Sequence, residues 1–468
     1  MGAGIAGLAA GAALRRADPD LDIVVLEAAP RTGGKLLTAE VAGVRVDVGA
    51  ESMLNRRPEA VGLARESGLA ADLVHPAVAG AGLWSRGRIR PMPRTLMGVP
   101  TDTRLLAESG VLSTSGLARV AMEPVLPATQ LDDRDVSVGW LVEERFGREV
   151  VDRLVEPLLG GVYAGHAREI SARAAVPQVV ALLDRDRSMM RAAAAATEQA
   201  PSVPVFAGLV GGVGRLPAAV AEAAGLEVRT GSTVRGLRRS PAPAGGWDLV
   251  VGDTRDPRPV HADAVVLAVP AAAAARLLRE AVPGAALELE RVEYASMAIV
   301  TMAFRARDLP PTSGTGFLVP PVERRAVKAA TYSFAKWDWV RAAGSADPGA
   351  DPGAGLLLLR CSLGRHREEQ LLQRGDGELV SLALEDLADA IGLSVRPVDA
   401  HVQRWGGALP QYAVGHLETV ARIRSAVARV PGLAVCGAAY DGVGIPACVA
   451  SGRLAATQVR SALADAGG

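Results

Sequence analysis

The chain begins with the glycine-rich segment MGAGIAGLAAG, the feature that most constrains its fold. Gly2, Gly4 and Gly7 match the Gly-x-Gly-x-x-Gly fingerprint, in which a strand ends in a tight turn that opens a helix. The glycines permit the turn, a close approach of the backbone to a pyrophosphate, and packing of helix on strand. The helix N-terminus then stabilises phosphate charge. The segment predicts a dinucleotide-binding βαβ unit; a purely structural turn is the alternative, because the chain has 52 glycines.

The next strand carries an acidic residue at its end. The segment DLDIVVLEA predicts a buried strand over residues 23–26, followed by Glu27, 25 residues after Gly2. A carboxylate here accepts hydrogen bonds from a ribose 2′-hydroxyl and would repel a 2′-phosphate, so FAD or NAD is favoured over NADP.

A second glycine segment follows the acid directly. Arg31, Gly33, Gly34 and Lys35 lie in EAAPRTGGK, where the glycines let the backbone fold beneath a cofactor and the cations can face its phosphates. This extension is typical of FAD proteins rather than NAD dehydrogenases. The alternative is an ordinary turn with solvated Arg31 and Lys35.

Only Met1 precedes the fingerprint, where a strand of about 5–6 residues is expected. We expect this strand to be the central one of the cofactor sheet, so its absence would leave unpaired backbone groups on both neighbours. Our hypothesis is a misassigned start, in which a valine codon was read as the initiator and the true chain begins upstream. The intact mass of the native protein tests it.

Composition narrows the function classes. A chain of 468 residues, 49% hydrophobic and 22% charged, predicts two to three globular domains at about 150 residues each. Zero net charge gives no general field for nucleic acid. Three cysteines, with no Cys-x-x-Cys, predict no disulfide framework and a cytoplasmic location. The histidines, cysteines and carboxylates show no ligand spacing, so we expect no metal, and no segment is long and apolar enough to span a bilayer.

The pattern along the chain predicts an α/β protein, α+β overall. Strand–turn–helix units at the start, in the middle and at the end of the chain indicate one Rossmann-like domain built from separated segments. Residues 101–200 show helical spacing of apolar residues, and residues 290–410 are strand-rich around a helix at about 374–391. AEVAGVRVDVGAE alternates and predicts a hairpin.

Five longer segments carry a resemblance to a known family. They are VDVGAESM (46–53), EPLLGGVYAGHAREIS (156–171), GLVGGVGRLPAAVA (208–221), RWGGALPQYAVGH (404–416) and CGAAYDGVGIPACVASGRLAA (436–456). Through them the chain resembles the protoporphyrinogen/coproporphyrinogen oxidase family of the flavin-containing amine oxidase superfamily. One departure is Ala447, where the family usually has Asp.

The resemblance implies a division into three domains. The FAD-binding domain would comprise residues 1–60, 201–275 and 415–468, with its first strand apparently missing. A mixed-sheet substrate domain would comprise residues 61–94 and 276–414. Residues 95–200 would form a helical insert.

The resemblance also implies a set of cofactor-binding residues. The pyrophosphate would be wrapped by Gly2, Ala3, Gly4, Ile5, Ala6 and Gly7, with Arg31, Gly33 and Gly34 nearby. Glu27 and Ala28 would hold the adenosine ribose, and the backbone of Val234 would contact adenine. The flavin would be bordered by Lys35, Gly49, Ala50, Glu51, Ser52, Trp405, Val443, Gly444 and Ile445. Without its motif, Trp405 would be interpreted as a core aromatic residue, whereas a glycine-rich turn before a helix offers N–H groups to the flavin in any case.

The implied reaction is the oxidation of coproporphyrinogen III to coproporphyrin III, with non-covalent FAD as hydride acceptor and O₂ reduced to H₂O₂. A cysteine that tethers FAD in some relatives is replaced by Ala439. The implied partners are the porphyrinogen, O₂ and the next enzyme of the haem pathway, which would receive the product. The chain offers no recognisable general base. Candidate partners for the substrate propionates are Arg88, Arg90, Arg94 and Arg360, against the alternative of solvated surface arginines.

Several alternatives remain open at this point. The nearest is a protoporphyrinogen IX oxidase; an Arg- and Ala-rich composition, typical of a GC-rich genome, favours the copro form of Gram-positive bacteria. An amine oxidase would cage its substrate between two aromatic residues, for which Tyr440 is one candidate without an obvious partner; a carotenoid desaturase matches less well. An NADPH-dependent flavoprotein needs a second fingerprint after a strand, and GLVGGVGRL has the wrong spacing and no clear strand before it. The non-enzymatic alternative is a truncated product that no longer holds FAD.

Overall fold

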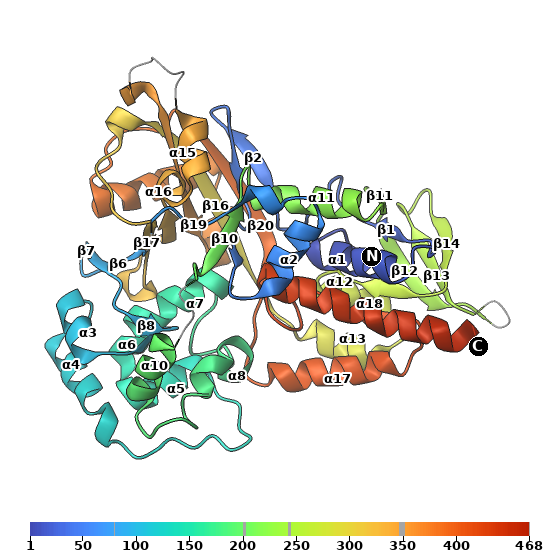
Figure 1. Ribbon diagram of the computed structural model, residues 1–468, viewed down its shortest axis with the longest axis horizontal. Helices are drawn as coiled ribbons and strands as arrows, with labels where there is room; N and C mark the ends of the chain where they lie inside the picture. The colour runs from blue at the N-terminus through green and yellow to red at the C-terminus, as the bar shows by residue number, and fades with distance from the viewer. Residues whose placement is uncertain (79, 200–202, 242–244, 346–351, 468) are drawn as a thin grey trace.

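The computed structural model describes residues 1–78, 80–199, 203–241, 245–345 and 352–467. Its elements form three groups (Figure 1). On the right of this view, the α1/α18 module gathers the two ends of the chain. A mixed-sheet module lies at the upper left and a helical insert at the lower left.

The α1/α18 module contains two parallel strand pairs. β1 (Val24–Leu26) pairs with β11 (Glu227–Arg229), and β15 (Val265–Leu267) pairs with β21 (Leu433–Val435). β1 begins one residue later than predicted. The other elements of the module are α1 (Ile5–Ala17), α2 (Pro58–Glu66), α11 (Leu216–Ala223), β12 (Val234–Arg239), β13 (Trp247–Val251), β14 (Arg258–Ala262), α12 (Ala271–Leu278), α13 (Pro283–Glu290), α17 (His416–Ala428) and α18 (Ile445–Gly467).

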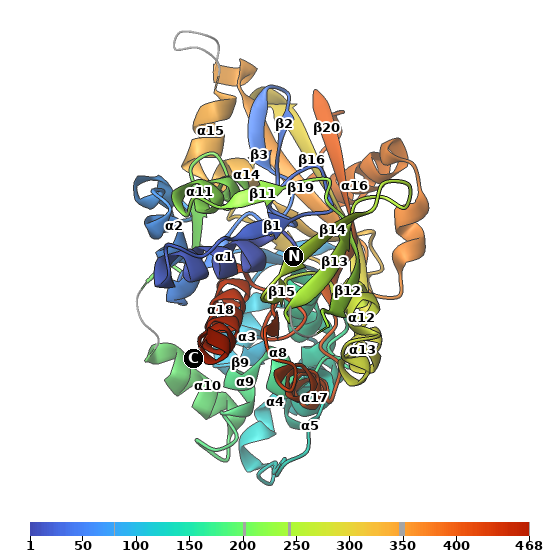
Figure 2. The ribbon, with the colours of Figure 1, turned by 90° about the vertical axis from the view of Figure 1, so that its right-hand side faces the viewer.

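Met1 and Gly2 lie between these two strand pairs, as Figure 2 shows from the end of the module. The Met1 amino group donates to the carbonyl oxygen of Val266 at 2.8 Å, and the Met1 carbonyl accepts from the Ala268 N–H at 2.9 Å. On the other side, the Gly2 N–H donates to the Leu26 carbonyl at 2.7 Å. The first two residues therefore connect the two strand pairs at the centre of the module.

The mixed sheet has the order β20-β16-β19-β18-β17-β6-β7 and is antiparallel except between β17 and β6. The strands are β6 (Gly82–Ser85), β7 (Arg88–Pro91), β16 (Tyr294–Arg305), β17 (Gly316–Leu318), β18 (Val327–Thr331), β19 (Leu356–Leu363) and β20 (Asp399–Pro410). One face, which includes Val300 and Leu359, packs on α16 (Asp376–Ile391), which contributes Leu387. The helix predicted at about 374–391 is confirmed.

The opposite face of the sheet packs on the predicted hairpin and on α15 (Asp338–Gly344). The hairpin consists of β2 (Thr38–Val41) and β3 (Val44–Asp47). Its two turn residues, Ala42 and Gly43, both have positive φ, 50° and 79°, which matches the twist of paired strands. The hairpin therefore brings the segment after Asp47 up to the sheet, although this segment lies far in sequence from the strands that it approaches. α14 (Ser333–Lys336) packs on α15 and on β19.

The helical insert confirms the helical prediction for residues 101–200. Its helices are α3 (Thr103–Ser109), α4 (Thr114–Ala121), α5 (Val138–Phe146), α6 (Arg148–Val150), a π-helical turn (Val151–Val155), α7 (Glu156–Tyr163), α8 (Ala172–Ala175), α9 (Pro177–Val180) and α10 (Met189–Glu198), with short strands β8 (Thr95–Leu96) and β9 (Val99–Pro100) at its entry. Over the described part of the chain, no helix combines the length and apolarity needed to cross a membrane.

The expectation that no clear strand precedes the glycine-rich stretch of residues 208–221 is wrong. A strand, β10 (Phe206–Leu209), directly precedes the glycines at 211 and 212. It pairs antiparallel with β4 (Met53–Leu54) and β5 (Leu73–Val74), so it is not a strand of a parallel nucleotide-binding sheet. Two of its four residues are small and it alternates poorly, which hid it in the sequence.

Candidate cofactor and active site

The fingerprint forms an uncapped helix N-terminus that faces open space. Gly4 is the N-cap of α1 and no side chain caps the helix. A Cβ atom at Gly7 would lie 2.0 Å from the Gly2 carbonyl oxygen, whereas a Cβ at Gly4 would have no atom within 4 Å. The turn therefore requires glycine at position 7, and the first turn of α1, which includes Ile5 and Ala6, leaves its N–H groups available to an anion.

Glu27 is held beside this turn. Its carboxylate accepts from the Ala3 N–H at 2.7 Å and from the Ala29 N–H at 2.8 Å. Its carbonyl oxygen accepts from the Ser232 N–H at 2.7 Å, which brings the start of β12 at Val234 close to the acid. Ala28 lies exposed next to it. The structure thus brings together the fingerprint, the predicted ribose-binding acid and the residue expected at adenine.

The second glycine segment, residues 31–35, packs against the fingerprint. The Gly33 N–H donates to the Ala3 carbonyl at 2.8 Å, and Gly33 and Gly34 both have positive φ. The Arg31 guanidinium donates to the Gly34 carbonyl at 2.8 Å and lies 5.8 Å from the centre of the Trp405 ring. This arrangement requires glycine at position 33, where a Cβ would lie 2.6 Å from the Leu36 carbonyl oxygen, and favours it at position 34.

Lys35 meets the segment of residues 49–52. Its carbonyl accepts from the Ala50 N–H at 3.1 Å, and a Cβ at Gly49 would lie 2.1 Å from the same carbonyl oxygen. Burial lowers the pKa of the Lys35 ammonium below its ordinary value, partly offset by Cys448. Ser52 is half-buried at the end of this segment.

Three side chains from the mixed sheet and α14 hold the segment of residues 47–51. The Trp405 indole N–H donates to the Val48 carbonyl at 3.0 Å. Glu51 forms ion pairs with Lys336 at 2.5 Å and Arg360 at 3.4 Å. Burial by itself would raise the pKa of Glu51, but these two cations hold it below its ordinary value. Trp405 is half-buried rather than a core aromatic residue.

The Arg360 side chain binds the backbone of this segment. Its guanidinium donates to the Asp47 carbonyl at 3.1 Å and to the Gly49 carbonyl at 2.7 Å. Arg360, one of the candidate propionate partners, therefore holds this backbone, and it is buried rather than a solvated surface arginine. Arg88 and Arg94 are exposed, and Arg90 donates to the Ser85 carbonyl at 3.0 Å.

The second helix N-terminus is that of α18. Ile445 packs in the core that contains Ala6, and Val443 packs against the core of the helical insert, so Gly444 lies between the two modules. The Tyr412 hydroxyl fixes this turn: it donates to the Ala438 carbonyl at 2.6 Å and accepts from the Gly442 N–H at 2.7 Å.

α1 and α18 approach closely. A Cβ at Gly452 would lie 2.2 Å from the Ala6 carbonyl oxygen, so α18 crosses the first turn of α1 at backbone contact. Tyr440 packs inside the core of this module, 1% exposed, and its hydroxyl has no partner among the described residues. It therefore does not form one wall of an aromatic cage.

Sequence reasoning missed three residues that shape this site: Asp47, Lys336 and Tyr412. Asp47 accepts hydrogen bonds from the Val213 and Gly214 N–H groups at 2.9 and 3.0 Å, linking the hairpin to the central glycine stretch. The quoted segments VDVGAESM and RWGGALPQYAVGH contain Asp47 and Tyr412, but no spacing rule marks Lys336.

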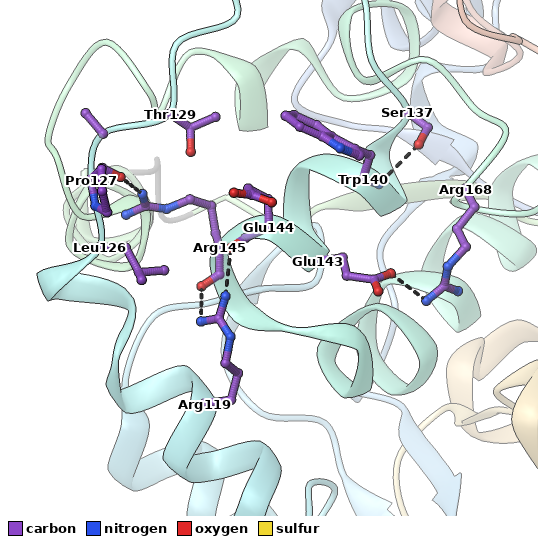
Figure 3. Close-up of a pocket in the computed structure, with 11 residues that line it drawn as sticks. Arg119, Leu126, Pro127, Thr129, Ser137, Trp140, Glu143, Glu144, Arg145 and Arg168 are labelled. Atoms are coloured by element: carbon purple, nitrogen blue, oxygen red, sulfur yellow. Dashed lines mark hydrogen bonds and ion pairs between the residues drawn. The ribbon is translucent and has the colours of Figure 1, made fainter.

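A pocket of about 740 Å³ lies elsewhere, in the helical insert, and Figure 3 shows its lining. Two of its arginines are held by neighbouring groups: Arg119 donates to the Arg145 and Glu144 carbonyls, and Arg168 pairs with Glu143 at 2.9 Å. None of its lining residues belongs to the predicted cofactor set. We assign it no role in cofactor binding.

The arrangement around α1 and α18 fits an extended dinucleotide. The open space before Gly4 suits a pyrophosphate, Glu27 suits ribose hydroxyls, and the segment of residues 49–52, Trp405 and the turn before α18 can surround a flavin. No group of three or more potential metal ligands occurs among the described residues.

Comparisons with known proteins agree with this geometry. The sequence profile described as "Flavin containing amine oxidoreductase" matches residues 5–460. The chain is 36% identical over 466 residues to "Coproporphyrinogen III oxidase" of Mycobacterium tuberculosis (strain ATCC 25618 / H37Rv), covering 99% of this chain and 97% of the relative. It is 32% identical over 470 residues to the protein of the same name from Bacillus subtilis (strain 168), covering 97% and 96%.

A solved structure is similar over the whole chain. The "Putative protoporphyrinogen oxidase" from Exiguobacterium sp. 255-15 superposes with a TM-score of 0.85 at 31% identity, covering 99% of this chain and 98% of that chain. The profile match establishes a flavin cofactor for the family, and the fold is that of flavin-dependent amine oxidases. The chain therefore belongs to the flavin-containing amine oxidoreductase family and, within it, to the protoporphyrinogen/coproporphyrinogen oxidase family.

Proposed function

We propose that the protein oxidises coproporphyrinogen III to coproporphyrin III, reducing three O₂ to three H₂O₂ for each porphyrin formed. The observation that carries the proposal is the full-length similarity, at 36% identity, to an enzyme named coproporphyrinogen III oxidase. The uncapped first turn of α1, which is open at Gly4, supports it, because such a helix N-terminus suits the pyrophosphate of a flavin dinucleotide.

The cofactor that we propose is FAD, bound without a covalent link. Ala439 offers no nucleophile beside Tyr440, and burial raises the pKa of Cys436 to about 12 and that of Cys448 to about 11, so neither is a thiolate at neutral pH. The chemistry that a bound flavin would supply is two-electron redox chemistry: a hydride equivalent would leave the porphyrinogen, and two electrons at a time would reach O₂.

The residues of the chain hold and shield this chemistry. The first turn of α1 would stabilise the pyrophosphate and Glu27 the ribose hydroxyls. Trp405 and Arg360 fix the backbone of residues 47–49, so the flavin-bordering segment is preorganised before any cofactor binds. The remaining predicted residues keep the roles that the family resemblance implies.

The porphyrinogen site that we propose lies between the mixed sheet and α7. Gly160 of α7 is buried, and a Cβ there would have no atom within 4 Å, so α7 turns bare backbone towards open space. A Cβ at its neighbour Gly161 would lie 3.8 Å from a methyl group of Leu318 on β17. A surface of this kind suits a flat macrocycle.

The domain division stays part of the proposal. The FAD-binding domain would comprise residues 1–60, 201–275 and 415–468, with residues 61–94 and 276–414 as substrate domain and 95–200 as helical insert. Two elements pack across these boundaries: α13 packs on α12 and α17, and the hairpin β2–β3 packs on the mixed sheet.

An anaerobic assay tests the proposal. Reduced coproporphyrinogen III is added to the purified protein, the flavin absorbance near 450 nm is followed, and O₂ is then admitted while porphyrin fluorescence and H₂O₂ are recorded. Bleaching of the flavin followed by coupled porphyrin and peroxide formation is expected. A purified protein with no flavin spectrum would support the truncated, non-enzymatic alternative.

Protoporphyrinogen IX is the second candidate substrate, because the similar solved structure carries the name of a protoporphyrinogen oxidase. Much faster turnover of protoporphyrinogen IX at equal concentration would contradict the copro assignment. Transfer of the product to the next haem-pathway enzyme and a cytoplasmic location stay predictions. An amine oxidase activity is not favoured, because Tyr440 is buried away from the site.

A further inference from the structure

Lys328 is a buried cation that neither cofactor binding nor the proposed chemistry uses. It lies on β18 at an irregularity of the β18–β19 register between Val327 and Ala329, and is 3% exposed. Its ammonium donates to the Gly364 carbonyl at 2.9 Å and lies 4.0 Å from the sulfur of Met297. A neutral oxygen and a thioether are weak compensation for a buried charge.

Met297 and Trp405 form a row of side chains between Lys328 and the segment of residues 47–51. Met297 on β16 is directly opposite Trp405 on β20, and the Trp405 indole donates to the Val48 carbonyl. The next residue, Ala298, belongs to the core on the other side of the sheet, so Met297 and Trp405 share the face towards residues 47–51. The Lys328 ammonium is therefore on the flavin side of the sheet.

A second buried cation lies close to Lys328. Arg365 is 5% exposed and donates to the Val319 and Arg325 carbonyls at 3.3 and 3.4 Å. Its ion-pair distance to Glu368 is 3.8 Å, and the Glu368 side chain is 53% exposed. Within the part of the chain that the structure describes, no carboxylate forms an ion pair with Lys328. Burial, and to a smaller extent Arg365, lower the pKa of Lys328 to about 7.

The charged groups on the elements around β18 do not supply the missing anion. Asp386 of α16 accepts from the Val327 N–H at 2.8 Å and lies 3.5 Å from Arg325. Glu156 of α7 accepts from the Ala167 N–H with one oxygen; its other oxygen is buried with no partner among the described residues, and burial raises its pKa. On β19, the cation Arg360 is held by residues 47–51.

We propose that Lys328, with Arg365 behind it, binds one propionate carboxylate of the porphyrinogen. The inference rests on the proposed function, because that substrate class brings the anion that Lys328 lacks among the described residues. A carboxylate would form a charge-assisted hydrogen bond with the ammonium and restore charge balance on the flavin side of the sheet. Lys328 is then a specificity-determining residue that favours porphyrinogens with a carboxylate at this position.

The binding of coproporphyrin III, the stable product, tests the proposal on the FAD-loaded enzyme. We expect Lys328→Met to raise the Kd of coproporphyrin III by about 10- to 100-fold, the effect of losing one hydrogen bond to a charged group. Lys328→Arg should keep Kd within a few fold. Arg305→Met, which removes an exposed cation from the same sheet, is the matched control and should leave Kd unchanged.

Two further measurements test the charge pairing, and each is made first on the wild-type protein and then on Lys328→Met. Coproporphyrin III tetramethyl ester should bind more weakly than the free acid, and Lys328→Met should not weaken binding of the ester further. In addition, the Kd of the acid should rise up to about tenfold per pH unit above pH 7, because binding requires the protonated ammonium, and should level off below pH 7. In Lys328→Met this pH dependence should be absent.

The outcomes separate this inference from the proposed function. If the wild-type enzyme oxidises coproporphyrinogen III but Lys328→Met keeps the wild-type Kd and pH dependence, the carboxylate site is wrong and the function stands. An unchanged Kd with a much slower flavin reduction would also overturn it, since Lys328 would then act on the reaction instead of on binding. If the wild-type enzyme neither binds coproporphyrin III nor oxidises the porphyrinogen, the proposed function itself fails.

Discussion

The guanidinium of Arg360 donates to the carbonyl oxygen of Gly49 at 2.7 Å, across 311 positions of sequence. The same side chain also reaches the Asp47 carbonyl and the Glu51 carboxylate. One arginine of the mixed sheet therefore fixes the backbone that borders the proposed flavin.

Replacing Arg360 should weaken cofactor binding without unfolding the protein. Lysine keeps the charge but cannot form the planar set of bonds, so Arg360→Lys should raise the Kd of the flavin by about 10- to 100-fold, the effect of losing one to two net hydrogen bonds. Titration of the apoprotein with FAD, followed by flavin fluorescence, measures it. Arg305→Lys, an exposed position of the same sheet, should bind FAD normally. Equal flavin affinity in both variants would show that Arg360 does not organise the segment.

The contact between α1 and α18 should not tolerate a single added methyl group. A Cβ at Gly452 would lie 2.2 Å from the Ala6 carbonyl oxygen, and neither helix backbone can yield locally. Gly452→Ala should lower the free energy of unfolding by about 1–3 kcal/mol and reduce the flavin content of the purified protein. Chemical denaturation and the ratio of flavin to protein absorbance measure the two effects.

Gly62 is the matched control for that substitution. It is also helical, in α2, but a Cβ there would have no atom within 4 Å. Gly62→Ala should therefore stabilise the protein by about 0.5–1 kcal/mol through helix propensity. A loss of stability similar to that of Gly452→Ala would mean that helical glycines are sensitive here for a reason other than the close approach.

The helical insert depends on a fully buried ion pair. Arg145 and Glu123 have side chains 1% and 0% exposed, and Glu123 also accepts from the Ser188 hydroxyl at 2.6 Å. Arg145→Met strands the carboxylate and should cost about 3–5 kcal/mol of unfolding free energy. Arg238→Met removes an exposed partner of Glu280 and should cost about 0–1 kcal/mol. Comparable small losses in both variants would contradict the structural role of the buried pair.

His416 should make the protein sensitive to acid. Its ring stacks on Tyr412 with 3.9 Å between centroids, and burial lowers its pKa to about 4, although the Tyr440 backbone and nearby carboxylates oppose the shift. An unfolded histidine takes up a proton near pH 6.5, so this contribution to stability is fully present above pH 6.5 and is lost as pH falls towards 4.

The phenylalanine variant isolates that effect. His416→Phe keeps the stacking and removes the titration, so between pH 7 and pH 5 the wild type should lose about 2 kcal/mol more of unfolding free energy than the variant. Urea denaturation at the two pH values measures the difference. His75→Phe, at an exposed position, should respond to pH as the wild type does. A parallel response of wild type and His416→Phe would rule out His416 as the titrating group.

Local rules predicted the parts of the site that lie in one stretch of sequence. The fingerprint of Gly2, Gly4 and Gly7, the acid Glu27 at a strand end, and the hairpin before Asp47 all follow from turn and strand chemistry over a few residues. Trp405 and the turn before α18 were predicted at the site through the family resemblance. Nothing in their spacing along the sequence indicates that they lie near the fingerprint.

The sequence by itself determined the family and predicted the kind of cofactor site, because the glycine turn expected at phosphate and the strand-end acid expected at ribose are features of short segments. Only the tertiary structure decided which charges meet. The bond from Arg360 to Gly49, the ion pair of Lys336 with Glu51 and the position of Lys328, which has no ion-pair partner among the described residues, arise where segments far apart in the chain meet at the mixed sheet. The physical reason is that burial and register set the surroundings of a charge, and both depend on contacts between distant residues that no local pattern contains.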